Sequence, residues 1–191
     1  MLNFEKGFTL DLDLKTGLSK KVDTKKRYLS DLRGMFADDA ALEAMIKEND
    51  DVIYEYHTLP VPEHEGDLAF GSSIVYPGNV AGEYFMTKGH FHTILGTAEV
   101  YYCMNGQGVM LCESPEGDVK AFELSPGTVV YVPKRYAHRS INTGNTPLHT
   151  FYVYRADAGH DYGTIEEKGF RKLYVEKDGI PTLVDNPKWA E

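Results

Sequence analysis

Glycine and proline divide most of this sequence into short segments that favour β-strands. Beyond Val52 the turns are marked by Pro77-Gly78, Pro115-Glu116-Gly117, Pro126-Gly127 and Thr143-Gly144-Asn145. The strands expected between them span 52–59, 67–76, 83–87, 99–104, 108–113, 118–123, 128–132, 137–142 and 148–155. Many short strands at close spacing predict an all-β sandwich or barrel and not alternating strands and helices.

The two ends of the chain differ from this middle part. Residues 7–15 alternate apolar and polar side chains and predict a strand exposed on one side. A short helix is expected from Asp38 or Asp39, with Leu42, Met45 and Ile46 as its apolar stripe. The tail 157–191 has mixed polarity, with a late strand at 170–175. A length of 191 residues suits one domain: an extension over 1–50, a barrel core over 51–155 and a second extension over 156–191.

Charge and hydropathy narrow the classes of partner. The formal net charge of -9 leaves no basic stripe for nucleic acid. No apolar run reaches membrane-spanning length and the start lacks a signal-peptide pattern, so a cytoplasmic protein is expected. The two cysteines, Cys103 and Cys112, flank a turn at 105–108. We expect them on the two strands of one hairpin, as buried free thiols.

Three histidines and one glutamate form a candidate metal-binding group. His90 and His92 are two residues apart, so on a strand both side chains leave the same face. Glu99 can join them only if the chain turns in between, and Gly96 suggests that turn. His138 belongs to a third expected strand, where it shares a face with Ser140 and Asn142. Three strands could direct these four ligands into one barrel interior.

The ligand types restrict the ion. Imidazole with carboxylate suits iron, manganese, nickel, cobalt or zinc, and the lack of thiolate argues against structural zinc. Four protein ligands on an octahedral ion leave two positions for water or substrate, as catalysis requires. Periodicity alone does not show that the spacing is meaningful, because two histidines often occur on a strand by chance.

Two motifs of the sequence resemble those of the cupin superfamily. They are His90-x-His92…Glu99…Gly106 and Gly127…Pro133…His138…Asn142. The resemblance implies a double-stranded β-helix, or jelly-roll, barrel with a metal held by three histidines and a glutamate. The six residues 93–98 are a longer gap than the three or four usual in the family, and Arg135 stands where glycine is normal.

A narrower resemblance is to the archaeal cupin-type glucose-6-phosphate isomerases. It rests on Thr-Lys-Gly-His-Phe-His at 87–92, Pro-Gly-Thr-Val-Val-Tyr-Val-Pro at 126–133 and Ala-Asp-Ala-Gly-His-Asp-Tyr-Gly at 156–163. It implies a homodimeric aldose–ketose isomerase that interconverts glucose 6-phosphate and fructose 6-phosphate. It also implies one divalent ion per subunit on His90, His92, Glu99 and His138. Fe2+ is expected first, with Ni2+, Mn2+, Co2+ or Zn2+ as alternatives.

The resemblance further implies a sugar-phosphate pocket. Its members would be Tyr54, Ser73, Thr87, Gly89, Tyr101, Tyr154, His160 and Tyr162. Ser73 stands where threonine is expected, but it keeps the hydroxyl. Glu99, His160 and Tyr154 are the expected catalytic residues. Lys88 and Arg135 either add positive charge or are solvated surface cations.

The chemistry leaves alternatives. Glu99 as the base fits an enediol route, yet coordination would lower its basicity, and a hydride shift avoids that conflict. His160 either assists ring opening or holds the loop 157–163. Two other functions use the same barrel: a ferrous dioxygenase and a non-catalytic sugar-binding cupin. Oxygen consumption would mark the dioxygenase, and a missing ligand set would mark the binding protein.

Overall fold

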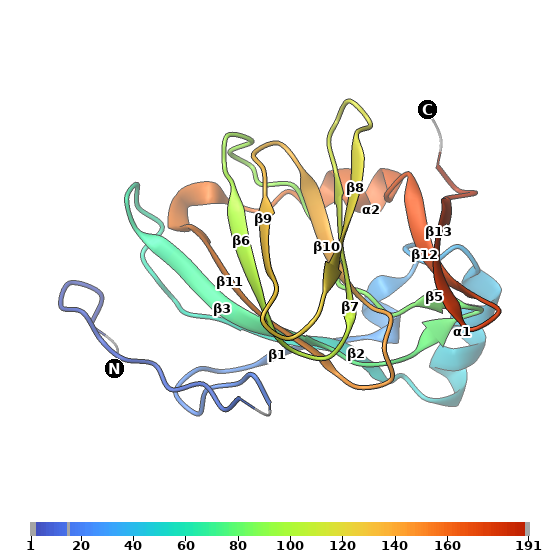
Figure 1. The fold of residues 1–191 in the computed structure, drawn as a ribbon, viewed down its shortest axis with the longest axis horizontal. Coiled ribbons are helices and arrows are strands. Elements are labelled where there is room, and N and C mark those ends of the chain that lie inside the picture. Colours follow the sequence, from blue (N-terminus) through green and yellow to red (C-terminus); the bar gives the residue numbers. More distant parts are fainter. Residues whose placement is uncertain (1–2, 15, 190–191) are drawn as a thin grey trace.

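The largest sheet carries most of the barrel wall. The computed structural model describes residues 3–14 and 16–189 (Figure 1). Within these ranges, one antiparallel sheet has six strands in the order β1-β2-β3-β11-β6-β9. Their bounds are β1 Lys25–Tyr28, β2 Val52–Thr58, β3 Leu68–Val75, β11 Leu148–Arg155, β6 Glu99–Asn105 and β9 Val129–Val132.

A second antiparallel sheet completes the barrel. In the described part of the chain it has the order β10-β7-β8. The bounds are β10 Ala137–Asn142, β7 Gly108–Glu113 and β8 Val119–Leu124. Every residue of β7 and β10 is buried. Tyr101 and Cys103 of β6 share one core cluster with Met110 and Cys112 of β7 and Ile141 of β10. The two sheets therefore enclose a common interior, and the predicted all-β jelly-roll class is confirmed.

A third sheet and helix α1 lie at one end of the barrel (Figure 1). Among the described residues the sheet has the order β13-β12-β5-β4. The bounds are β13 Ile180–Asp185, β12 Lys172–Lys177, β5 Glu83–Tyr84 and β4 Asn79–Val80. The helices are α1 Asp39–Glu48 and α2 Gly163–Lys168, with 3-10 turns η1 Leu29–Leu32 and η2 Ala156–Ala158. None of the helices described here is long and apolar enough to cross a membrane.

The predicted helix and barrel strands are confirmed. Asp38 caps α1 by accepting the Ala41 N–H at 2.9 Å, and Leu42 is buried. The expected strands between 52 and 155 are present with shifts of one or two residues at their ends. The segment 83–87 is the exception, because after β5 only a single bridge joins Met86 to Ile141.

The strand expected over 7–15 is wrong. Residues 7–14 form no strand, and residue 15 lies outside the described ranges. Phe8 stacks on Phe70 at a ring distance of 6.3 Å, and the chain then turns between Asp13 and Leu18. The alternation follows burial, because Phe8, Leu10 and Leu12 are half-buried, but none of the described strands pairs with this segment.

The cysteines do not lie on one hairpin, contrary to expectation. Cys103 is in β6 of the large sheet and Cys112 is in β7 of the second sheet. The turn between them therefore carries the chain from one sheet to the other. Gly106 has a φ of +86°, and a Cβ there would lie 2.5 Å from the Pro147 carbonyl oxygen. Both thiols are free and buried, as expected, and burial raises their pKa values to about 11 and 12.

Candidate metal centre and its cavity

A cavity with roughly 100 Å³ of space for the centres of water-sized molecules opens between the barrel sheets. Hydroxyls, imidazoles and one carboxylate dominate its wall. The lining residues are Tyr54, Tyr56, Thr58, Ser73, Thr87, Lys88, Gly89, His90, Glu99, Tyr101, His138, Ser140, Tyr152, Tyr154, His160 and Tyr162.

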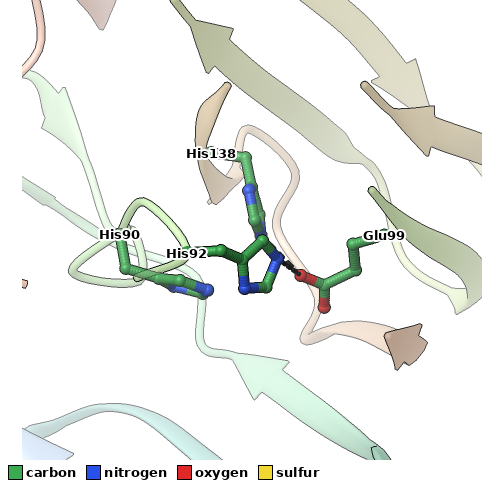
Figure 2. Close-up of side chains that lie close together, drawn as sticks. All are labelled: His90, His92, Glu99 and His138. Carbon is green, nitrogen blue, oxygen red and sulfur yellow. Dashed lines mark hydrogen bonds and ion pairs between the residues drawn. The ribbon is translucent and has the colours of Figure 1, made fainter. Parts of the chain in front are cut away.

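The four predicted ligands meet at this cavity. Figure 2 shows His90, His92, Glu99 and His138 converging on one centre, and one ligand atom from each lies within 4.8 Å of the others. His90 pairs with His138 through an isolated antiparallel bridge with N–O distances of 3.3 and 3.2 Å. A turn at 93–96 then redirects the chain, so that Glu99 can begin β6 facing the histidines.

Glu99 is the centre's negative charge. Its Oε2 atom lies 3.1 Å from His92 Nε2 and 2.9 Å from His138 Nε2. Burial by itself would raise the pKa of Glu99, but the two imidazoles outweigh burial and hold that pKa well below its usual value. Burial and the neighbouring His138 lower the pKa of His90. The centre thus presents a carboxylate beside a neutral imidazole at neutral pH.

These residues fit a divalent metal ion. His90 Nε2 is buried without a hydrogen-bond partner among the described residues. His92 Nδ1 lies 3.2 Å from the Gly159 carbonyl oxygen, and His138 Nδ1 lies 3.4 Å from that of Tyr136. Such backbone partners fix the tautomer of a ligating histidine and leave Nε2 for the ion. The described residues could therefore hold one ion through three imidazoles and one carboxylate.

The wall next to the ligands offers hydrogen-bond donors. Thr87 Oγ1 accepts the Ser140 N–H at 3.1 Å, which leaves its own proton for another acceptor. Ser73 Oγ lies 2.9 Å from Thr150 Oγ1. The Gly89 backbone has a φ of +76° and also lines the cavity. Hydroxyl and backbone donors gathered in this way are suited to an anion.

Tyrosines complete the interior. The Tyr154 ring lies 5.5 Å from the His92 ring, and the Tyr101 ring lies 5.5 Å from the His138 ring. Burial raises the pKa values of both phenols, so they stay protonated and can donate. Tyr152 also lines the cavity, and its hydroxyl donates to the His57 carbonyl oxygen at 3.0 Å.

His160 and Tyr162 stand at the exposed rim of the cavity. Their rings stack at 5.8 Å, and the His160 ring lies 4.5 Å from the His90 ring. Desolvation lowers the pKa of His160, so the imidazole is neutral at neutral pH. Desolvation raises the pKa of Tyr162 to about 12. The rim thus carries one proton acceptor next to one proton donor.

Comparison with known proteins places the chain in a family. A sequence model described as "Glucose-6-phosphate isomerase (GPI)" matches residues 26–188. A glucose-6-phosphate isomerase of Thermococcus litoralis is 47% identical over 98% of this chain and 99% of its own. The chain belongs to the glucose-6-phosphate isomerase family.

Other relatives of this family are similar at comparable length. The Pyrococcus furiosus protein is 46% identical over 98% of this chain and 100% of its own. A Sinorhizobium medicae protein of the same name is 40% identical over 94% of this chain and 86% of its own. Among solved structures, a mutant oxalate decarboxylase of Bacillus subtilis is 22% identical with a TM-score of 0.46, over 59% of this chain and 28% of that one.

The predicted site residues of this glucose-6-phosphate isomerase family member come together in space. His92 is a member of the metal-binding group, and every other predicted site residue lines the cavity. The cavity is also lined by three residues that the sequence did not predict as part of the site, Tyr56, Thr58 and Ser140. Strand alternation could have found them, because two follow Tyr54 along β2 and Ser140 shares a face with His138.

The two candidate cations occupy different places. Lys88 lines the cavity, but its Nζ atom lies 2.8 Å from Glu166 Oε1. Arg135 is not a lining residue and pairs with Glu116 at the surface. Charge for an anion would therefore come from the Lys88 side of the cavity.

Proposed function

We propose that the protein interconverts glucose 6-phosphate and fructose 6-phosphate, a step of glycolysis and gluconeogenesis. One observation carries this proposal: the metal-binding group and the anion-suited donors line one cavity in a member of the glucose-6-phosphate isomerase family. A sugar phosphate needs both features, because its phosphate must be bound while hydrogen moves at C1 and C2.

The phosphate is assigned to the donor-rich wall. Ser73, Thr87 and Gly89 would supply two hydroxyls and one N–H, with the hydroxyls of Tyr54 and Tyr162 nearby. Burial raises the Tyr54 pKa, so this phenol also stays protonated. These groups hold the substrate at its unreactive end and leave the sugar carbons to the metal-binding side.

The metal ion is assigned to His90, His92, Glu99 and His138, one per subunit. We infer Fe2+ in first place, with Ni2+, Mn2+, Co2+ and Zn2+ as alternatives, because imidazole and carboxylate accept all of them. A bound ion would supply Lewis-acid polarisation of the sugar oxygens.

Glu99 is assigned as the base of an enediol route. Its carboxylate is ionised at neutral pH, so it can take the proton from C2 of the aldose and return it to C1, while the hydroxyl proton of O2 passes to O1. Tyr101 and Tyr154 can donate hydrogen bonds to the sugar oxygens, and neutral His160 can relay the proton that ring opening requires. The route is tested by isomerisation in heavy water. Solvent deuterium in the product supports it, whereas complete direct hydrogen transfer would overturn it.

A coupled assay tests the function itself. Fructose 6-phosphate is supplied, and the glucose 6-phosphate formed is detected through a coupling dehydrogenase. An oxygen electrode measures oxygen consumption in the same reaction. Conversion without oxygen consumption is expected. No conversion with any of the five ions restored, or oxygen uptake with a sugar substrate, would contradict the proposal.

The proposal also covers the oligomeric state, the location in the cell and the domain organisation. A homodimer is supported by an exposed apolar patch on the outer face of β6 and β9. Val100 there pairs with Tyr131 and Tyr102 pairs with Val129. A cytoplasmic location suits an enzyme of sugar-phosphate metabolism. One domain is supported by the shared core, which extends from Leu29 to Phe170.

A further inference from the structure

Arg139 is a buried guanidinium behind the cavity wall. It follows His138 in β10, is 2% exposed and is not a lining residue. Its Nη2 atom donates to the Lys88 carbonyl oxygen at 2.5 Å, and Nη1 lies 2.9 Å from Met86 Sδ. The guanidinium carbon lies 4.2 Å from the centre of the Phe170 ring. Arg139 therefore contacts the cavity wall from the rear.

The contact at Lys88 fixes the orientation of one peptide. The described chain contains no cis peptide bond, and in a planar trans peptide the C=O and N–H point in opposite directions. Because the Lys88 carbonyl points back to Arg139, the N–H of Gly89 points forward, on the cavity side. No acceptor for this N–H occurs among the described residues.

Close packing around Gly89 also restricts this segment. A Cβ at this position would lie 2.8 Å from the Phe170 ring, 3.0 Å from the His138 carbonyl oxygen and 3.1 Å from Arg139 Cβ. With a φ of +76°, the backbone here is one that side-chain-bearing residues rarely adopt. Gly89 thus rests directly on the residues around Arg139, and the peptide has little freedom to rotate.

The charge of Arg139 is only partly compensated. Within the described ranges it forms no ion pair inside 4.0 Å, and its Nε atom has no partner. The nearby buried acid Glu83 accepts the Ala37 N–H at 2.7 Å through Oε2, while its Oε1 atom is unpartnered. Burying a guanidinium without a direct counter-ion costs folding free energy, so we expect the charge of Arg139 to serve another purpose. A positive charge behind an N–H that faces an anion site would strengthen the binding of an anion there.

We propose that Arg139 is a positioning residue that aims the Gly89 N–H at the substrate phosphate and adds positive potential behind it. This rests on the proposed function, since the phosphate is assigned to this wall. Arg139 does not touch the substrate and acts only through the Lys88–Gly89 peptide.

The test compares Arg139→Lys and Arg139→Met with the wild type and with Met86→Leu. The control removes the sulfur contact of Arg139 but leaves its bond to Lys88. For Arg139→Met we expect KM for fructose 6-phosphate and the calorimetric Kd for inorganic phosphate to rise about tenfold or more. For Arg139→Lys we expect a smaller rise, and kcat and bound metal should change less than about threefold in both.

Two results would overturn the proposal. The first is a folded Arg139→Met variant whose Kd for phosphate stays within twofold of the wild-type value. The second is a variant that loses bound metal and kcat while KM is unchanged, because that pattern means that Arg139 only supports the neighbouring His138. If the wild type binds phosphate but converts no fructose 6-phosphate, the proposed function fails while the phosphate comparison still decides the role of Arg139.

A wild-type measurement covers the case in which the variants do not fold. In 15N-labelled protein loaded with diamagnetic Zn2+, inorganic phosphate is titrated while the glycine amide signals are followed. The Gly89 amide is expected to shift, with the exposed Gly66 amide as reference. A Gly89 signal that does not move at saturating phosphate would contradict the proposal.

Discussion

Glu99 shows how burial and charge are balanced at a single residue. It is 2% exposed, yet its carboxylate stays ionised because two imidazoles lie within 3.1 Å. A low pKa suits a metal ligand, since the carboxylate need not lose a proton before binding. The same low pKa makes Glu99 a weak base, so proton abstraction depends on polarisation of the substrate.

Glu99→Gln is expected to lower kcat/KM about 100-fold or more and to lower the bound metal. The amide keeps the size of the side chain but carries no charge and accepts no proton. Steady-state kinetics and metal analysis measure both effects. Glu55→Gln is the control, because Glu55 is also buried but bonds to Tyr76 outside the cavity. Equal activity in wild type and Glu99→Gln would contradict the assignment.

His57 is expected to make the fold sensitive to acid. It is 1% exposed, its Nε2 has no partner among the described residues, and burial lowers its pKa. With a folded pKa below the unfolded value, its contribution is fully present above about pH 6.5 and is lost as the pH falls through the folded pKa.

Urea unfolding at pH 7.5 and 5.5 measures this effect. We expect His57→Gln to reduce the loss of unfolding free energy between the two values. His64→Gln, at a side chain 79% exposed, should leave the loss unchanged. The same pH dependence in all three proteins would show that His57 is not responsible.

At the scale of elements, alternation predicted strands well where both a partner and a buried face exist. It failed at residues 7–14, where the pattern has no strand partner, and at β1, whose Lys-Lys-Arg-Tyr sequence has no apolar pattern. The metal-binding group could be predicted because its residue types suit a metal ion and its motifs resemble those of the cupins, whereas spacing alone left the group open. The proposed role of Arg139 could not be predicted, because it depends on a hydrogen bond to Lys88, which lies in a loop 51 residues away in the sequence.

Helix α1 offers a test at this scale. Asp38→Ala removes the side chain that accepts the Ala41 N–H and should lower the free energy of unfolding by about 1 kcal/mol. Asp38→Asn keeps a capping oxygen and should stay within about 0.5 kcal/mol of wild type. Urea unfolding at constant pH measures both. An equal loss in the two variants would argue against capping.

At the scale of the whole molecule, strands β6 and β9 present exposed apolar side chains on the outer face of the large sheet. Val129 and Tyr131 are each 62% exposed and continue across the sheet to Val100 and Tyr102. Contiguous exposed apolar patches mark interaction sites more often than single exposed residues do. We therefore place the contact of the proposed homodimer on this face.

Val129→Asp is expected to convert a dimer to monomers in sedimentation velocity, because it buries a charge in the apolar contact. Ile180→Asp is the matched control, since Ile180 is 64% exposed but lies on β13 at the end of the molecule. A monomeric wild type, or a Val129→Asp dimer as stable as the control, would refute this placement.

We propose that the isomerase activity depends on one divalent ion held by His90, His92, Glu99 and His138. The most direct test is a titration of metal-stripped protein with Fe2+ under anaerobic conditions, with bound metal and fructose 6-phosphate conversion measured at each point. Activity is expected to rise in proportion to bound metal and to saturate at one ion per chain. Full activity in the stripped protein, or no activity at one bound ion per chain, would contradict the proposal.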